Sequence, residues 1–199
     1  MLKKIKKKKT SKKVVKKSKK KKIIKLEEIK PDQIILRSRQ ILLFGSINEE
    51  KSCNIIKQLL TLEQLSKDPI FLWINSGGGN VYDGFSIIDT ITGITSPVIT
   101  IITGKACSMA GLISLAGEKR FMSKNSVWMA HDVFAYNYDY VTKLLAGADN
   151  SKELQRRVFA YLASKTKLTP KDLNKARNEE LWLYPEECKE KGIIDVILN

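Results

Sequence analysis

Continuous apolar runs separated by helical patterns are the main structural signal along the chain. Residues 41–44 (ILLF), 70–74 (IFLWI) and 98–103 (VITIIT) lack polar alternation, so each run predicts a strand that is buried on both faces. Residues 48–66 and 80–94 lie between these runs and carry apolar side chains at helical spacing. Strands that alternate with helices are typical of βαβ units, so the pattern predicts an α/β protein with a mostly parallel sheet.

The second half of the chain predicts shorter strands and more helix. A helix is expected from about residue 106 to residue 116, and residues 120–122 and 127–130 are typical of short strands. Residues 140–166 then predict a long helix, and the sequence TPKD at residues 169–172 is typical of a helix start. The C-terminal part is therefore expected to be mostly helical.

The positive charge of the chain is concentrated at its beginning. The 199 residues contain 36 Lys and Arg against 21 Asp and Glu, and fourteen of the lysines lie in residues 1–22, which hold no acidic residue. Because like charges repel and few apolar residues are present, we expect residues 1–22 to form a disordered leader and residues 23–199 to form one nearly neutral domain. The other interpretation of the leader is an electrostatic arm that contacts nucleic acid or other anionic surfaces.

The sequence shows no signal for secretion, for a membrane span or for a metal site. The leader has no apolar core of the kind found in signal peptides, and no apolar run is long enough for a membrane span. The three cysteines, Cys53, Cys107 and Cys188, show no metal-ligand spacing. We therefore expect no metal and no organic cofactor, and a reducing cytoplasm as the location.

Three features could carry chemistry, and each also has an ordinary structural interpretation. His131 is the single histidine, so an imidazole base would have to be this residue, although it could simply end a strand. Ser108 follows a buried strand at a predicted helix start, where it could act as a nucleophile or as a helix cap. The glycine triplet at residues 77–79 could form a phosphate loop, an ordinary turn or an oxyanion pocket, and the lysine-serine pair of a phosphate loop is missing.

Taken together, these segments resemble the ClpP family, the proteolytic subunits of the Clp protease. Residues 75–81 (NSGGGNV), 104–111 (GKACSMAG) and 128–131 (WMAH) are similar to the family's INSPGG, GxAASMG and MIH motifs. Residues 183–198 (LYPEECKEKGIIDVIL) are similar to the family's closing SAxEAxxYGLID segment. The order and spacing match, and the resemblance covers about residues 35–198.

The resemblance implies a catalytic triad. Ser108 would be the nucleophile, His131 the general base and Glu180 the acid that orients the histidine. The family normally has aspartate where this chain has Glu180, and Glu179 is the neighbour that could serve instead. Glutamate orients the histidine in some related triads, although its extra methylene demands a different approach.

The same resemblance implies an oxyanion hole, a fold and an assembly. The backbone N–H groups of Gly79 and Met109 would form the oxyanion hole. The fold would be the ClpP/crotonase-like spiral of βαβ units with a C-terminal helical part. Copies of the chain would form two stacked seven-membered rings, and a partner AAA+ ATPase would unfold protein substrates and feed them into the rings.

Some residues depart from the family pattern. Gly77 stands where the family has proline, and HDV at residues 131–133 replaces its HQP. Residues 134–140 (FAYNYDY) replace a glycine-rich stretch, and we expect their aromatic side chains to contribute to contacts between rings or to pack within the subunit. The sequence thus predicts a serine endopeptidase; the alternatives are a catalytically weak structural or regulatory ring subunit and a crotonase-type acyl-CoA enzyme.

Overall fold

A computed structural model describes residues 30–134 and 140–199 of the chain. Residues Pro31–Asn199 form one compact unit, separate from residues Met1–Lys30. The expectations for the leader, residues 1–22, and for Tyr136 and Tyr138 fall outside the described residues. Phe134 and Tyr140 are described, and both side chains are exposed.

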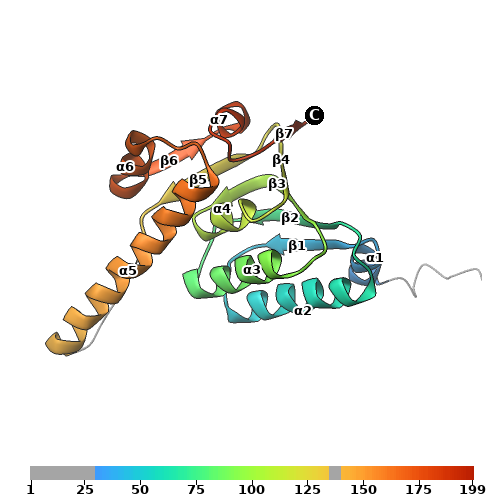
Figure 1. Cartoon of the computed structure of the whole chain (residues 1–199), viewed down its shortest axis with the longest axis horizontal. Coiled ribbons are helices and arrows are strands. Elements are labelled where there is room, and N and C mark those ends of the chain that lie inside the picture. Colours follow the sequence, from blue (N-terminus) through green and yellow to red (C-terminus); the bar gives the residue numbers. More distant parts are fainter. Residues whose placement is uncertain (1–29, 135–139) are drawn as a thin grey trace, which may run out of the picture. The chain divides into compact units, whose positions relative to one another are not determined.

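A mostly parallel sheet is the centre of the fold, as the sequence predicts (Figure 1). Five strands follow one path, in which each pairs in parallel with the next: β1 (Gln40–Phe44), β2 (Ile70–Ser76), β3 (Val98–Cys107), β4 (Lys119–Ser123) and β7 (Val196–Leu198). Two further strands lie off this path. β5 (Val127–His131) pairs in parallel with β3, and β6 (Glu180–Leu183) pairs antiparallel with β5.

Strand β3 is long because its two halves pair with different neighbours. Residues Ile99–Ile102 pair with β4, whereas Lys105–Cys107 pair with β5. Between the two halves lies Gly104, whose φ is +85°, and its backbone N–H donates to Ser126 Oγ at 2.9 Å. A residue with a side chain would be strained in this conformation. Because β3 changes its partner, the last residues of β3 lie beside β5.

The helices are α1 (Pro31–Arg37), α2 (Glu49–Leu65), α3 (Val81–Gly93), α4 (Met109–Ser114), α5 (Val141–Lys165), α6 (Pro170–Asn178) and α7 (Pro185–Glu190). Helices α2, α3 and α5 and the start of α6 follow the boundaries that the sequence predicts, α4 differs in length, and α1 and α7 are not predicted. The Thr169 hydroxyl accepts from the Asp172 N–H while the Asp172 carboxylate accepts from the Thr169 N–H, which confirms the predicted helix start. Helix α4 is shorter than predicted, because β3 continues to Cys107.

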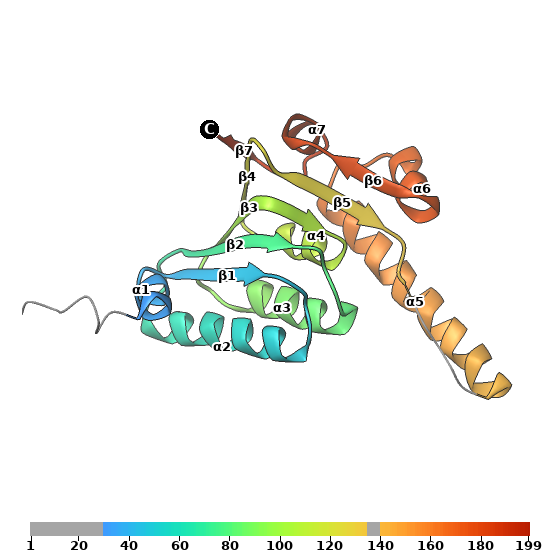
Figure 2. The ribbon, with the colours of Figure 1, turned by 180° about the vertical axis from the view of Figure 1, so that it is seen from behind.

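A large part of the core lies between one face of the sheet and helices α2 and α3. These two helices run side by side along β1, β2 and β3 in both views (Figures 1 and 2). Ile41 and Leu43 of β1 are fully buried on this face, whereas Leu42 and Phe44 are 38% and 40% exposed. The prediction of strands buried on both faces is therefore wrong for β1, whose second face remains more than a third exposed at both of these residues.

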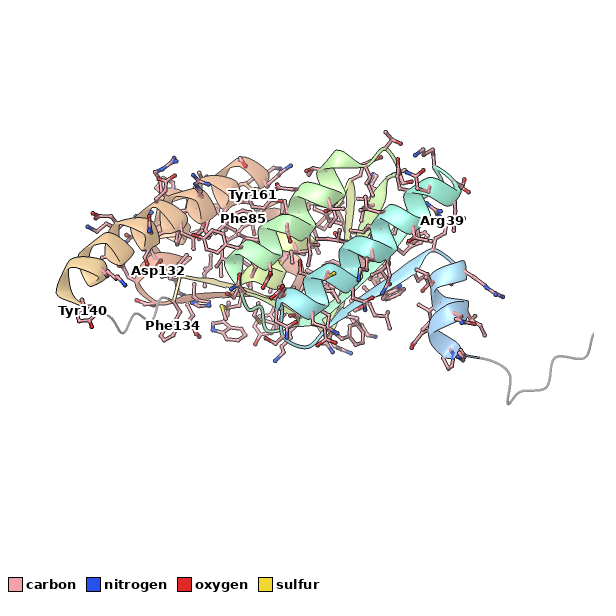
Figure 3. All side chains as sticks on the ribbon, turned by 90° about the horizontal axis from the view of Figure 1, so that it is seen from below. Arg39, Phe85, Asp132, Phe134, Tyr140 and Tyr161 are labelled. Atoms are coloured by element: carbon pink, nitrogen blue, oxygen red, sulfur yellow. The ribbon has the colours of Figure 1, made fainter. Side chains whose placement is uncertain are left out.

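Helix α5 returns from the loop after β5 and packs against α3. Phe85 of α3 and Tyr161 of α5 meet edge to face, with ring centroids 6.3 Å apart (Figure 3). Burial raises the pKa of Tyr161 to about 12, so its hydroxyl stays protonated. No helix among the described residues is both long enough and apolar enough to cross a membrane.

Candidate active site

Ser108 stands at the turn that joins β3 to α4. Its backbone has φ +54° and ψ −127°, a region that residues with side chains rarely adopt, and its N–H donates to Met129 O at 2.8 Å. Its side chain makes no capping hydrogen bond, so the interpretation of Ser108 as an ordinary helix cap is wrong. A strained residue persists only where its surroundings fix it, and such residues are frequent at active sites.

The glycine loop, residues 77–79, is held between Ser108 and the segment after β1. A Cβ on Gly78 would lie 2.8 Å from Ser108 Cβ, and one on Gly79 would lie 2.1 Å from the carbonyl oxygen of Ile47. Ile47 N–H donates to Gly78 O and Asn80 N–H donates to Ile47 O, both at 2.9 Å. Only glycine fits these positions, because backbone atoms approach them from both sides.

The same contacts argue against a phosphate loop. Asn80 is the N-cap of α3, and its Oδ1 accepts from the backbone N–H groups of Tyr82 and Asp83 at 2.9 and 3.1 Å. A phosphate at a helix N-terminus binds free backbone N–H groups of the first helical turn, and here Asn80 already occupies two of them. In the described part of the chain, by contrast, the N–H groups of Gly79 and Met109 donate no hydrogen bond, so both are available to an oxyanion.

His131 is the last residue of β5, and its neighbour on β6 is set by the strand register. The antiparallel pairing places His131 directly opposite Glu180. Side chains at directly opposite positions project from the same face of a sheet. Glu179 is the C-cap residue of helix α6 and lies one position before the first paired residue of β6. Glu180 is therefore the better placed of the two acids.

The Glu180 carboxylate is exposed and has another partner. Its Oε2 accepts a hydrogen bond from Trp182 Nε1 at 2.8 Å. Over the residues that the structure describes, no hydrogen bond joins His131 to Ser108 or to Glu180. Catalytic hydrogen bonds are often long in the absence of substrate and shorten when substrate binds.

A cavity of about 500 Å³ brings most of the predicted residues together. Ser108, His131, Gly79 and Met109 all line it, whereas Glu180 does not. The remaining lining residues are Gly77, Asn80, Val81, Leu112, Asp132, Val133, Phe134 and Val158. The lining therefore combines a hydroxyl, an imidazole and two free amides with apolar walls, which is the set that attack on a carbonyl group requires.

Asp132 is the functional candidate that the sequence analysis missed. It follows His131 directly, and its two carboxylate oxygens each accept from Gln155 Nε2 at 2.8 Å. The departure from the family's HQP motif was the only signal at this position, because Gln155 lies 23 residues away on α5.

The thiol beside the serine is a poor competitor for its role. Burial raises the pKa of Cys107, so the thiol remains protonated at neutral pH, and the protonated form is not nucleophilic. Within residues 30–134 and 140–199, no cluster of three or more His, Cys, Asp or Glu side chains is arranged to hold a metal ion.

Comparisons with known proteins identify the family of the chain. The model of the Clp protease family matches residues 19–199. The ATP-dependent Clp protease proteolytic subunit 2 of Treponema denticola is 35% identical over 168 residues, which are 83% of this chain and 84% of that protein. The subunit of the same name from Treponema pallidum is 31% identical over 170 residues, 84% of this chain and 85% of that protein.

Among solved structures, a ClpP1 mutant from Listeria monocytogenes has the same fold. The two chains are 32% identical with a TM-score of 0.76, and the match covers 84% of this chain and 95% of the other. The predicted ClpP-like fold is confirmed.

Proposed function

The chain belongs to the Clp protease family, and from this premise we propose that it is a serine endopeptidase with Ser108 as its nucleophile. One observation carries the proposal. Ser108 has a strained backbone and a hydroxyl that makes no capping hydrogen bond. It lines the same cavity as His131, Gly79 and Met109, and the last two have free N–H groups.

The reaction proceeds in two halves. His131 takes the proton of the Ser108 hydroxyl as the oxygen attacks the peptide carbonyl, and the N–H groups of Gly79 and Met109 stabilise the oxyanion. The C–N bond then breaks, His131 gives the proton to the leaving amine, and an acyl-enzyme remains. Water, deprotonated by His131, hydrolyses this ester and restores the serine.

Glu180 is the acid that we assign to His131. The antiparallel register supports this role, because it sets the two residues opposite each other. An anionic carboxylate would fix the imidazole tautomer and stabilise the imidazolium. For this purpose the Glu180 side chain has to leave Trp182 or bond both groups at once.

The wider setting follows from the family resemblance. We propose that copies of the chain form two stacked seven-membered rings in the cytoplasm, and that a partner AAA+ ATPase unfolds the protein substrates. The partly exposed Leu42 and Phe44 on one face of β1 support contact with another chain, since removal of apolar surface from water favours association.

A second candidate is a catalytically weak ring subunit. The observation that favours it is the missing hydrogen bond between His131 and either Ser108 or Glu180 in the described part of the chain. Labelling with a fluorophosphonate probe separates the two functions, because only an activated serine reacts rapidly.

The experiment compares the wild type with Ser108→Ala and with Ser164→Ala, a control whose hydroxyl lies on α5 outside the candidate cavity. We expect labelling at Ser108 and hydrolysis of a short fluorogenic peptide by the wild type and the control, and a loss of several orders of magnitude in Ser108→Ala. Absence of labelling in the wild type would favour the weak ring subunit.

The role of Glu180 has its own test. Glu180→Gln should lower the turnover sharply at nearly preserved geometry, whereas Glu179→Gln should leave it close to that of the wild type. The reverse order of the two turnover numbers would transfer the role to Glu179. Wild-type turnover in both variants would indicate a serine–histidine pair that works without an acid.

A further inference from the structure

Asp132 gives the candidate cavity a charge that the proposed hydrolysis does not use. It is the only carboxylate among the described residues that line the cavity, and the lining contains no lysine or arginine. Figure 3 shows Asp132 beside helix α5. A negative charge in the same cavity as the proposed nucleophile affects the substrates that bind, because the field of a charge is stronger in a cavity with apolar walls than in water.

Neutral groups hold this carboxylate in place. Gln155 Nε2 donates to both oxygens at 2.8 Å, and the backbone N–H of Val133 donates to Oδ1 at 2.7 Å. Across the described residues, no lysine or arginine forms an ion pair with Asp132. The carboxylate is therefore oriented but not neutralised, and each oxygen retains lone pairs for another donor.

The apolar part of the lining fits the aliphatic stem of a lysine or arginine side chain of a substrate. Val81, Leu112, Val133 and Val158 supply apolar surface to the same cavity. Lysine and arginine carry a charged head on an aliphatic stem, and such side chains place the stem against apolar surface and the head at a polar partner. A glutamate side chain would bring a second negative charge to the carboxylate and would be repelled.

We propose that Asp132 is a specificity-determining residue, which binds the lysine or arginine side chain that precedes the scissile bond of a peptide substrate. This inference rests on the proposed serine endopeptidase activity. Gln155 acts as a positioning residue, because its amide orients the carboxylate from helix α5 without contacting the substrate.

The test uses three fluorogenic peptides and the full-length protein. The peptides are identical except for the residue before the scissile bond, which is lysine, norleucine or glutamate. Norleucine has the stem of lysine without its charge. A charge-assisted hydrogen bond that forms in the cavity should raise kcat/KM for lysine over norleucine about tenfold in the wild type, and glutamate should be the poorest substrate.

Variants at the same position isolate the charge. Asp132→Asn keeps the shape and the contact with Gln155, so the ratio of lysine to norleucine should fall to about one. Asp132→Lys should reverse the preference, with glutamate above lysine. Asp149→Asn removes an acid on α5 whose side chain is 79% exposed and lies outside the cavity lining, and it should retain the wild-type ratio.

The outcomes separate this inference from the proposed function. Hydrolysis of all three peptides without a preference for lysine, or an unchanged ratio in Asp132→Asn, overturns the specificity role and leaves the peptidase standing. An equal loss of kcat/KM for all three peptides in Asp132→Asn overturns it in favour of a structural role. If the wild type neither hydrolyses any peptide nor reacts with the fluorophosphonate probe, the proposed function fails and the specificity role fails with it.

Discussion

Replacing Gly79 with alanine should damage both the fold and the proposed oxyanion hole. The new Cβ would lie 2.1 Å from Ile47 O and 2.7 Å from Ile47 N. Both are backbone atoms of a neighbouring segment, so no side chain can rotate away. The two segments must separate by about 0.9 Å for the shorter contact to reach 3.0 Å, the closest approach that real Cβ atoms show.

The effect on stability follows from the contacts that this separation breaks. The hydrogen bonds Ile47 N–H to Gly78 O and Asn80 N–H to Ile47 O are both 2.9 Å long and would be lost, at about 1 kcal/mol each. The φ of +152° at Gly79 adds about 1–3 kcal/mol of strain for a residue with a side chain. We therefore expect the free energy of unfolding to fall by about 3–5 kcal/mol and the Tm by roughly 10 °C.

The effect on activity is separate. The displaced segment carries the N–H group that we assign to the oxyanion hole, and loss of one such donor lowers kcat by about 10²–10³-fold. Thermal unfolding measures the first effect and hydrolysis of a fluorogenic peptide, at a temperature where the variant is folded, measures the second.

Two other glycines serve as controls. A Cβ on Gly93, at the end of α3, would meet no atom within 4 Å, so Gly93→Ala should leave the turnover unchanged and should not lower the Tm. A Cβ on Gly77 would meet only Lys105 Nζ, at 3.8 Å, so Gly77→Ala should change the free energy of unfolding by less than about 1 kcal/mol. A Gly79→Ala protein with the Tm and turnover of the wild type would refute the argument.

Three more predictions concern other parts of the chain. Ser108→Gly should have a Tm a few degrees above that of Ser108→Ala, since glycine relieves the strain at φ +54°; equal Tm values would contradict this strain. Burial raises the pKa of Asp172, but hydrogen bonds from Lys191 and Thr169 outweigh it and lower the pKa from 3.8 to about 2. The ionised carboxylate therefore stabilises the folded state above about pH 4, and this stabilisation is lost as the pH falls through 2. In urea unfolding, Asp172→Asn should therefore cost about 1 kcal/mol at pH 7 and nothing near pH 2, and a loss independent of pH would argue against the ion pair. Removal of residues 1–22 should shift the Tm by no more than a few degrees and leave a particle many times the 22.6 kDa of one chain in sedimentation; a monomer at micromolar concentration would refute the ring.

The sequence by itself determined most of the succession of elements, although not α1, β6 and α7, and it indicated two residues of the candidate site. The long apolar runs became β1, β2 and β3 and the helical patterns became α2, α3 and α5, because each pattern reports the local period of a strand or a helix. Ser108 and His131 were candidates because one follows a buried strand at a helix start and the other is the only histidine, and the resemblance to the ClpP motifs then assigned them catalytic roles.

Only the tertiary structure decided how these elements meet. It left Leu42 exposed, because apolar runs do not reveal whether a second layer covers a strand. It set His131 opposite Glu180, since strand register depends on partners far apart in the chain. It also brought Gln155 to Asp132 across 23 residues. Local periodicity cannot encode contacts of this kind, because they join residues that lie far apart in the chain.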